Sequence, residues 1–208
     1  MFWILDQPES SKVDDPLFGA ISGTGDTVVW QTKICPDCKR PIEIKQVGNL
    51  EIELMGSELE DFVWLDYPSI IVSERLKSLL QNSDLSGFSF REVEIVYWWY
   101  QGDEQYHLED APPLYQLVIT GRGGSMLPQN KLAAESECKT CCKTRYKRLE
   151  DGIFVDENKW DGSDAFYLDE FPGYSLFTDR FIDFLEKNDI TGYTAVAADT
   201  YPLHRFSV

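Results

Sequence analysis

The sequence predicts an α+β fold of two pseudo-repeats, each a small, mainly antiparallel sheet with one covering helix. Two observations predict it. Residues 73–88 recur, with similar residues in the same order, as residues 178–193, an offset of 105. The cysteine pair Cys35-Pro36-Asp37-Cys38 recurs as Cys138-Lys139-Thr140-Cys141, an offset of 103. Two copies are fewer than a solenoid needs, so an internal duplication is the better interpretation.

A third recurrence sets the expected domain organisation. Trp64-Leu65-Asp66 returns as Tyr167-Leu168-Asp169, between the cysteine pair and the helix in both copies. We therefore expect a first pseudo-repeat over residues 1–104 and a second over residues 105–208. A shared four-cysteine zinc site would join them into one compact unit.

One helix is expected in each half, over about residues 73–82 and 178–187. Ser73 and Thr178 are suited to accept hydrogen bonds from free amides in the first helical turn. Apolar residues follow at the i, i+3, i+4 spacing that gives a helix one buried face. Each helix is followed by a glycine that can adopt positive φ and turn the chain toward the next strand, Gly87 and Gly192.

The strands are expected where apolar residues alternate with polar ones or form short runs bounded by turn residues. These segments are 2–5, 27–31, 41–44, 50–54, 88–100, 114–120, 152–155, the second part of 160–169, and 193–198.

Composition excludes several classes of protein. A net charge of −17 disfavours binding to nucleic acid and to anionic lipid, and it speeds encounter with a basic protein. The chain has no run near the ~20 apolar residues of a membrane span, and its start lacks the pattern of a secretory signal. We therefore expect a cytoplasmic protein, a monomer when free, with reduced thiols.

Two Cys-x-x-Cys pairs predict one structural zinc site with four sulfur ligands: Cys35, Cys38, Cys138 and Cys141. Each pair supplies two thiolates from one tight turn, and tetrahedral zinc needs four ligands. Three alternatives remain: Cys142 in place of Cys141, a redox-active or disulfide pair, and plain buried thiols. His107 and His204 are expected to be solvated or packed side chains.

No catalytic motif is present, and we expect a protein that is not an enzyme. The chain lacks a Gly-x-Ser-x-Gly elbow, a His-Glu-x-x-His motif and a phosphate-binding loop. Arg75 and Arg180, and likewise Asp66 and Asp169, recur in both halves, so capping or ion pairing is their expected role. A hydrolase or transferase with an unrecognised site remains the alternative.

The cysteine pairs, the helix start Val72-Ser73-Glu74-Arg75-Leu76 and the turn Leu85-Ser86-Gly87-Phe88 together resemble the double-CxxCG motif proteins. Lys39 and Cys142 stand where the motif has glycine. These bacterial proteins are grouped with the immunity proteins of polymorphic toxin systems. The resemblance implies an antidote that binds a cognate, basic toxin and neutralises it. A zinc-stabilised adaptor for another cellular protein is the alternative.

The expected toxin-binding surface is the acidic segment between the halves, with the aromatic residues that precede it. Its members are Trp98, Trp99, Tyr100, Asp103, Glu104, Glu109 and Asp110. The alternative is a solvated linker beside core aromatic residues. The basic residues near the second cysteine pair are interpreted as local charge balance.

Overall fold

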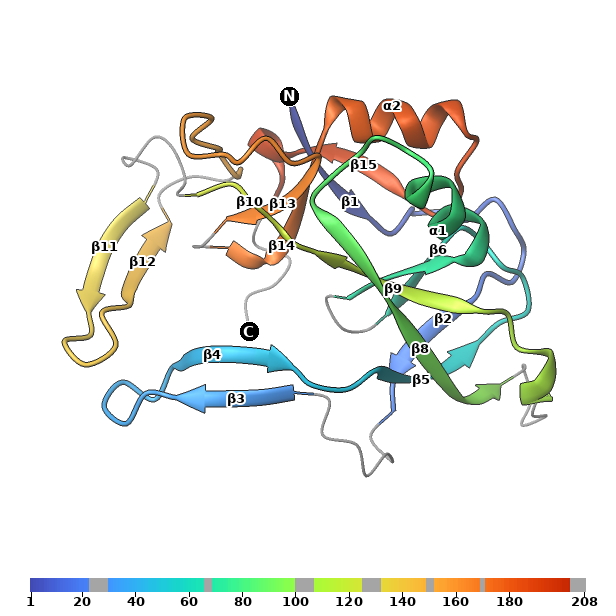
Figure 1. Cartoon of the computed structure of the whole chain (residues 1–208), viewed down its shortest axis with the longest axis horizontal. Helices are drawn as coiled ribbons and strands as arrows, with labels where there is room; N and C mark the ends of the chain where they lie inside the picture. Colours follow the sequence, from blue (N-terminus) through green and yellow to red (C-terminus); the bar gives the residue numbers. More distant parts are fainter. Residues whose placement is uncertain are drawn as a thin grey trace.

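The computed structural model describes residues 1–22, 30–65, 69–99, 107–124, 132–148, 152–168 and 171–202. Strands dominate these residues, which contain two α-helices (Figure 1). The strands are β1 (Phe2–Asp6), β2 (Phe18–Ile21), β3 (Trp30–Ile34), β4 (Pro41–Gln46), β5 (Leu50–Met55), β6 (Phe62–Leu65), β7 (Ile70–Ser73), β8 (Phe88–Trp99), β9 (Leu114–Ile119), β10 (Gly121–Arg122), β11 (Leu132–Glu137), β12 (Thr144–Arg148), β13 (Ala165–Leu168), β14 (Phe171–Thr178) and β15 (Thr194–Ala197). The α-helices are α1 (Glu74–Gln81) and α2 (Asp179–Lys187). Two short 3₁₀ helices are η1 (Leu108–Asp110) and η3 (Ala198–Thr200).

Six strands close into a barrel in the order β2-β5-β8-β9-β7-β6. The β5–β8 and β2–β6 pairs are parallel, and the other pairs are antiparallel. Along β5, Leu50, Ile52 and Leu54 are buried and alternate with less buried residues, as the period of two in a strand requires. With Val63 and Ile71 they belong to the cluster of apolar residues that forms the barrel core.

The second sheet has five strands in the order β10-β13-β14-β1-β15. Its β1 comes from the start of the chain and lies between β14 and β15, with Ile4 opposite both Leu176 and Val196. Correspondingly, β9 from after residue 105 lies in the barrel between β7 and β8. Each sheet is therefore completed by a strand from the other half of the chain.

The predicted fold class is wrong. The protein is mainly β, with a closed six-stranded barrel and an open five-stranded sheet in place of two similar sheets, each with its own helix. The physical reason lies in strand pairing. An alternating pattern identifies a strand and its buried face, but the ladder partner depends on contacts distant in sequence. The pattern therefore could not indicate that β1 and β9 are exchanged.

Both predicted helices are confirmed, and their N-terminal caps are as expected. The Ser73 hydroxyl accepts a hydrogen bond from the Leu76 amide at 3.2 Å, and Thr178 accepts one from the Phe181 amide at 3.3 Å. The two helices contribute to a single core. It includes Leu76, Leu80, Phe181, Ile182 and Leu185, together with Phe62 and Phe177 from the strands.

Asp61 is a buried carboxylate, 5% exposed, that joins the start of α1 to the turn after α2. It accepts hydrogen bonds from the Ser73 hydroxyl at 3.0 Å and from Arg75 at 2.5 Å. It also accepts one from the Thr191 amide at 3.1 Å. A buried carboxylate is stable only when donors satisfy it, and here the donors come from both halves of the chain.

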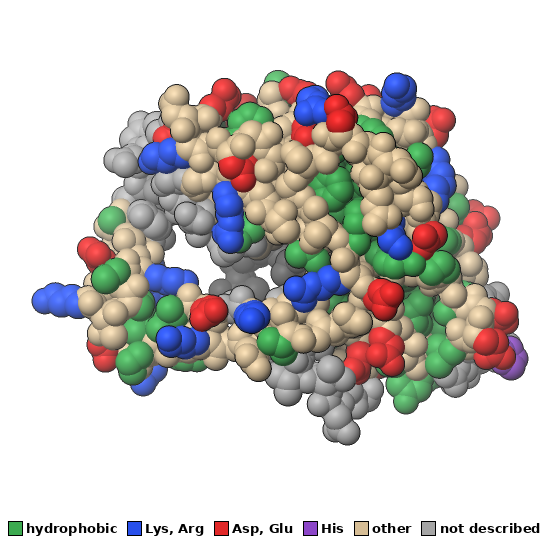
Figure 2. Space-filling view, in the orientation of Figure 1, with side chains coloured by type: hydrophobic (Ala, Val, Ile, Leu, Met, Phe, Trp, Pro, Cys, Tyr) green, Lys and Arg blue, Asp and Glu red, His purple; other side chains and the backbone are tan. Residues whose placement is uncertain are grey.

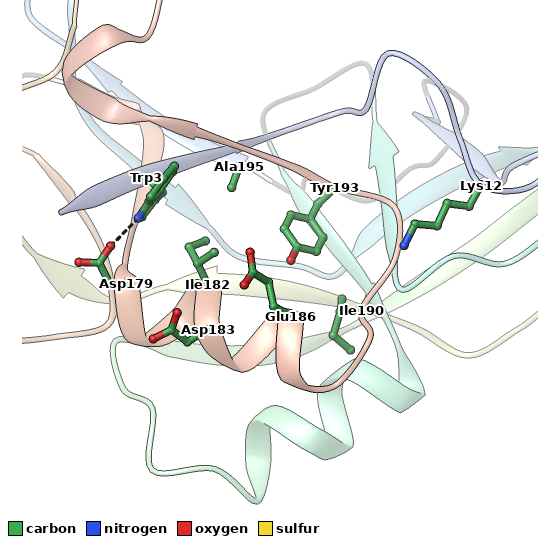
Figure 3. Close-up of a pocket in the computed structure, with 9 residues that line it drawn as sticks. All are labelled: Trp3, Lys12, Asp179, Ile182, Asp183, Glu186, Ile190, Tyr193 and Ala195. Atoms are coloured by element: carbon green, nitrogen blue, oxygen red, sulfur yellow. Dashed lines mark hydrogen bonds between the residues drawn. The ribbon is translucent and has the colours of Figure 1, made fainter.

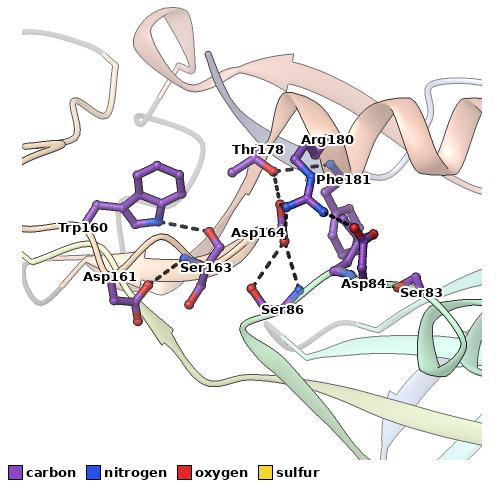
Figure 4. A network of polar contacts seen from close by, with 11 residues as sticks. Ser83, Asp84, Ser86, Trp160, Asp161, Ser163, Asp164, Thr178, Arg180 and Phe181 are labelled. Atoms are coloured by element: carbon purple, nitrogen blue, oxygen red, sulfur yellow. Dashed lines mark hydrogen bonds and ion pairs between the residues drawn. The ribbon is translucent and has the colours of Figure 1, made fainter.

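Asp164 makes the corresponding contacts at the other helix and is 2% exposed (Figure 4). The Thr178 hydroxyl and the Ser86 amide each donate to it at 3.0 Å, and Arg180 donates at 3.4 Å. Arg180 also pairs with Asp84 at 3.0 Å. The predicted ion-pairing role of Arg75 and Arg180 is therefore confirmed, whereas Asp66 and Asp169 lie outside the described residues.

The remaining strand predictions have mixed outcomes. Those at 2–5, 41–44, 50–54, 88–100, 114–120, 160–169 and 193–198 correspond to β1, β4, β5, β8, β9, β13 and β15, with shifted ends. The prediction at 27–31 falls partly on residues that are not described, and β3 begins at Trp30. Residues 152–155 form no strand: Val155 makes a single bridge, and the Ile153 amide donates to the Ala198 carbonyl at 2.6 Å, outside any ladder. The predictions omitted β2, β6, β7, β10, β11, β12 and β14.

Candidate metal centre

Two β-hairpins carry the cysteine pairs away from the barrel and the five-stranded sheet (Figure 1). Cys35 and Cys38 lie in the turn between β3 and β4, and Cys138 and Cys141 lie in the turn between β11 and β12. Both turns close in the same way. The Cys35 amide donates to the Arg40 carbonyl at 2.9 Å, and the Cys138 amide donates to the Lys143 carbonyl at 3.1 Å.

The residue after each Cys-x-x-Cys pair adopts positive φ. Lys39 has φ of 60° and Cys142 has φ of 55°. Their amides donate to the carbonyls of Cys35 and Cys138, at 3.1 and 2.8 Å. Glycine adopts this backbone region at least cost, which explains why a motif of this kind has glycine there. The turn geometry is thus retained although both positions carry a side chain.

The four predicted cysteines meet at the hairpin tips, close enough to hold one metal ion. All four sulfur atoms lie within 4.8 Å of one another. The Sγ atoms of Cys35 and Cys138 are 3.7 Å apart, and those of Cys38 and Cys141 are 3.8 Å apart. A tetrahedral ion with metal–sulfur bonds of about 2.3 Å requires sulfur–sulfur edges of about 3.8 Å. The donor set therefore fits a tetrahedral ion.

Cys142 is exposed and is not one of these four residues. Cys35 is fully buried, whereas Cys38, Cys138 and Cys141 are half-buried. The spacing of the second pair thus matches that of the first, and the extra thiol faces solvent.

The surroundings of the cluster shift the pKa values of its thiols in different directions. The Arg40 backbone N–H, together with its guanidinium, lowers the pKa of Cys38 to about 6. The Cys141 and Thr140 amides lower the pKa of Cys138. The Lys143 amide also lowers the pKa of Cys141, but loss of water and the neighbouring thiols outweigh it and raise that pKa to about 11. A bound cation would remove this mutual repulsion, because metal coordination deprotonates thiols.

Further contacts join the two tips without a metal. The Arg40 side chain donates to the Lys143 carbonyl at 3.2 Å, and the Lys143 ammonium donates to the Pro41 carbonyl at 3.1 Å. Thr140 also hydrogen-bonds to Asp37. Figure 2 shows Lys and Arg side chains gathered on these hairpins, although the protein is acidic overall. Positive charge around the sulfur cluster offsets the charge of its thiolates.

The predicted partner surface is divided by the structure. Trp98 is 8% exposed and donates its indole N–H to the Gly56 carbonyl at 2.7 Å, so it is a core residue. Trp99 points the other way, is 37% exposed and stacks on Tyr97 with ring centroids 5.6 Å apart. Glu109 and Asp110 are exposed in η1. Tyr100, Asp103 and Glu104 lie outside the described residues.

Two exposed apolar residues near Trp99 had no signal in the sequence. Met55, 43% exposed, lies directly opposite Trp99 in the β5–β8 ladder. Leu108, 39% exposed, lies in η1, which packs against β8. Met55 ends an alternating strand on its exposed face, where the pattern predicts a polar residue. Strand register was needed to bring it next to Trp99.

Within the described ranges, neither helix is long and apolar enough to cross a membrane. No curated protein matches the chain.

One protein-family model does match part of it. The matched residues, 51–111, run from β5 through β6, β7, α1 and β8 to the end of η1. All four clustered cysteines lie outside this segment, so the match does not bear on the double-CxxCG motif itself. It does confirm the resemblance to immunity-type proteins: residues 51–111 are similar to the immunity protein family Imm11.

Proposed function

We propose that this protein is a cytosolic immunity protein that binds a cognate toxin and blocks it without catalysis. The match of residues 51–111 to the Imm11 immunity family carries this proposal. The net charge of −17 supports a basic toxin, because opposite charges speed the encounter of two proteins. Five free cysteines support a reducing compartment.

The proposed ion at the sulfur cluster is zinc, in a structural role. Four thiolates in tetrahedral geometry suit zinc, and they leave no position for a water molecule or a substrate. Cys35 and Cys38 would hold it from one hairpin, and Cys138 and Cys141 from the other. The ion would fix the two hairpins to each other at their tips. It would tie residues that are 103 positions apart in the chain.

The proposed history of the chain is an internal duplication in which the halves exchanged their first strands. Three pairs of contacts recur. Those of Asp61 and Asp164 and those of the two cysteine turns recur at an offset of 103 residues, and those of β1 and β9 at an offset of 112, from Trp3 to Tyr115. Because each half supplies the strand that the other lacks, both sheets are complete within a single chain. This supports a monomer.

The proposed toxin contact begins at the exposed end of β8. Trp99 and Met55 form an apolar centre there. The Glu53 carboxylate accepts a hydrogen bond from the Trp99 indole, and Glu109 lies in η1, which packs against β8. Exposed aromatic residues surrounded by charge are typical of the few side chains that dominate an interface.

The test uses the toxin encoded beside this protein's gene. The purified proteins should form an equimolar complex by size-exclusion chromatography at about 50 and about 500 mM salt, and the toxin in it should be inactive. A double substitution, Trp99→Ser with Met55→Ser, should weaken binding by about 10-fold or more, because it removes the apolar centre. The control Val47→Ser, at another exposed apolar residue (42%), should not. No complex at either salt concentration would contradict the proposal, and a stable partner without toxin activity would favour the adaptor.

A further inference from the structure

A hollow of about 410 Å³ lies beside α2, away from the metal centre and from the end of β8 (Figure 3). Its apolar lining includes Trp3 of β1, Ile182 of α2 and Ala195 of β15. Asp183 and Glu186 line it from α2, where a spacing of three residues puts both on one helix face. Figure 3 shows the Glu186 carboxylate directed toward Tyr193, at the opposite end of the hollow from Trp3.

The corresponding place beside α1 already holds a cation. The Lys77 ammonium lies 3.4 Å from the centre of the Tyr115 ring and 3.6 Å from the carboxylate of Glu74. The strand register relates the two places, because Tyr115 lies opposite Val72 in the β7–β9 ladder and Trp3 lies opposite Phe177 in the β14–β1 ladder. Tyr115 thus corresponds to Trp3.

The residues on the helices correspond at the offset of 105. Glu74 and Asp179 each begin a helix, directly after the capping residue. Lys77 corresponds to Ile182, so α2 lacks the cation that α1 supplies. In addition, Ser78 and Gln81 correspond to Asp183 and Glu186. The second site therefore has an aromatic ring and more negative charge, but no lysine at the position that fills the first.

Of the three carboxylates at the hollow, Asp179 has hydrogen-bond partners, whereas Asp183 and Glu186 are available to a ligand. Asp179 accepts hydrogen bonds from the Trp3 indole at 2.8 Å and from the N-terminal ammonium at 2.6 Å. Among the described residues, Asp183 and Glu186 make no ion pair, and both are exposed. Burial first, and then the charge of Glu186, raise the pKa of Tyr193. Lys12 lies at the far edge of the hollow.

We propose that this hollow binds a single arginine or lysine side chain of the cognate toxin. The inference rests on the proposed function, and it identifies a second contact besides the end of β8. The cation would lie between the rings of Trp3 and Tyr193 and pair with Asp183 and Glu186. An aromatic face attracts a cation most strongly when the ring is Trp or Tyr. Two carboxylates match the forked donors of a guanidinium, which makes arginine the better fit.

The decisive variant is the double substitution Asp183→Asn with Glu186→Gln, which removes both charges and keeps the side-chain shapes. Affinity for the toxin encoded beside the gene is measured by calorimetry at about 50 mM salt. The variant should bind about 10- to 100-fold more weakly than the wild type, as expected for loss of a close interfacial ion pair. The matched control, Glu92→Gln with Glu94→Gln in β8, removes the same charge from exposed positions outside both proposed contacts and should lose less affinity.

A second variant, Ile182→Lys, puts into the hollow the cation that Lys77 supplies beside α1. It should also weaken binding of the toxin, because the new ammonium would occupy the hollow. The melting temperature of this variant tells whether Lys is tolerated at position 182, which is buried. If the wild type binds the toxin but the double variant binds equally well, the hollow is not the contact and the immunity function stands. If the wild type does not bind the toxin, the proposed function fails, and this inference fails with it.

Discussion

Replacing Asp164 with Ala should destabilise the protein far more than replacing Asp84, although both carboxylates pair with Arg180. Asp164 has a side chain only 3% exposed, and the Asp84 side chain is 90% exposed. The substitution Asp164→Ala leaves the Ser86 amide, the buried Thr178 hydroxyl and Arg180 without their common acceptor. Hydrogen bonds to a charged acceptor are worth about 1.5–3 kcal/mol each, so losing the two from Ser86 and Thr178 should cost about 3–5 kcal/mol in the free energy of unfolding.

Asp84→Ala removes only an exposed pair, so its cost should be below about 1 kcal/mol. For a chain of this size, about 1 kcal/mol corresponds to a change in melting temperature of about 2–4 °C. Asp164→Ala should therefore lower the melting temperature by about 6–20 °C. Urea unfolding followed by tryptophan fluorescence gives the free energies directly. Equal costs for the two variants would refute the argument that Asp164 joins the two halves.

Three further predictions concern the metal, a glycine turn and the exchanged strands. Elemental analysis should find one zinc per chain; Cys138→Ser should lose it and Cys142→Ser should keep it, and equal zinc in both would contradict the ligand assignment. Gly87→Ala should lower the free energy of unfolding by about 2 kcal/mol or more, because φ is +90° and a Cβ would press on the Ala165 carbonyl. Gly173→Ala, with open space around it, serves as the control. Similar melting temperatures for the two variants would show that the contact at Gly87 relaxes. Residues 1–104 and 105–208 should each fail to fold when produced alone, because each lacks an inner strand, and should form a folded complex when produced together; a stable, cooperative unfolding transition for either fragment alone would argue against strand exchange.

Features encoded locally could be predicted from the sequence. Ser73 and Thr178 cap the two helices by bonds to amides three residues on, and such caps depend on adjacent residues alone. The Cys-x-x-Cys turns are equally local. Two of them at matching places were enough to predict that Cys35, Cys38, Cys138 and Cys141 would meet.

Features that depend on distant pairing could not be predicted. The pattern of residues 2–5 indicates a buried strand, but β1 forms its ladders with β14 and β15, at the opposite end of the chain. Closure of the barrel requires β2 to pair with both β5 and β6, which strand patterns cannot specify. Adjacent residues of a strand face opposite sides, but only the fold shows that Trp98, and not Trp99, is the buried one.

The hollow beside α2 was missed for a similar reason. Trp3 and Glu186 are far apart in sequence, and the exchange of β1 brings Trp3 next to α2. The recurring helix did contain a usable signal. Position 77 is Lys and the corresponding position 182 is Ile, while two polar residues of the first copy become acidic in the second. A comparison of the two copies at these positions could have identified the site.

The immunity function is tested most directly by growth of bacteria that produce the toxin encoded beside this protein's gene. Co-production of the wild-type protein should restore growth to that of cells without toxin. Co-production of the Asp183→Asn, Glu186→Gln variant should restore it less, at equal protein levels. Growth arrest that the wild-type protein does not relieve, although it is folded and abundant, would contradict the account.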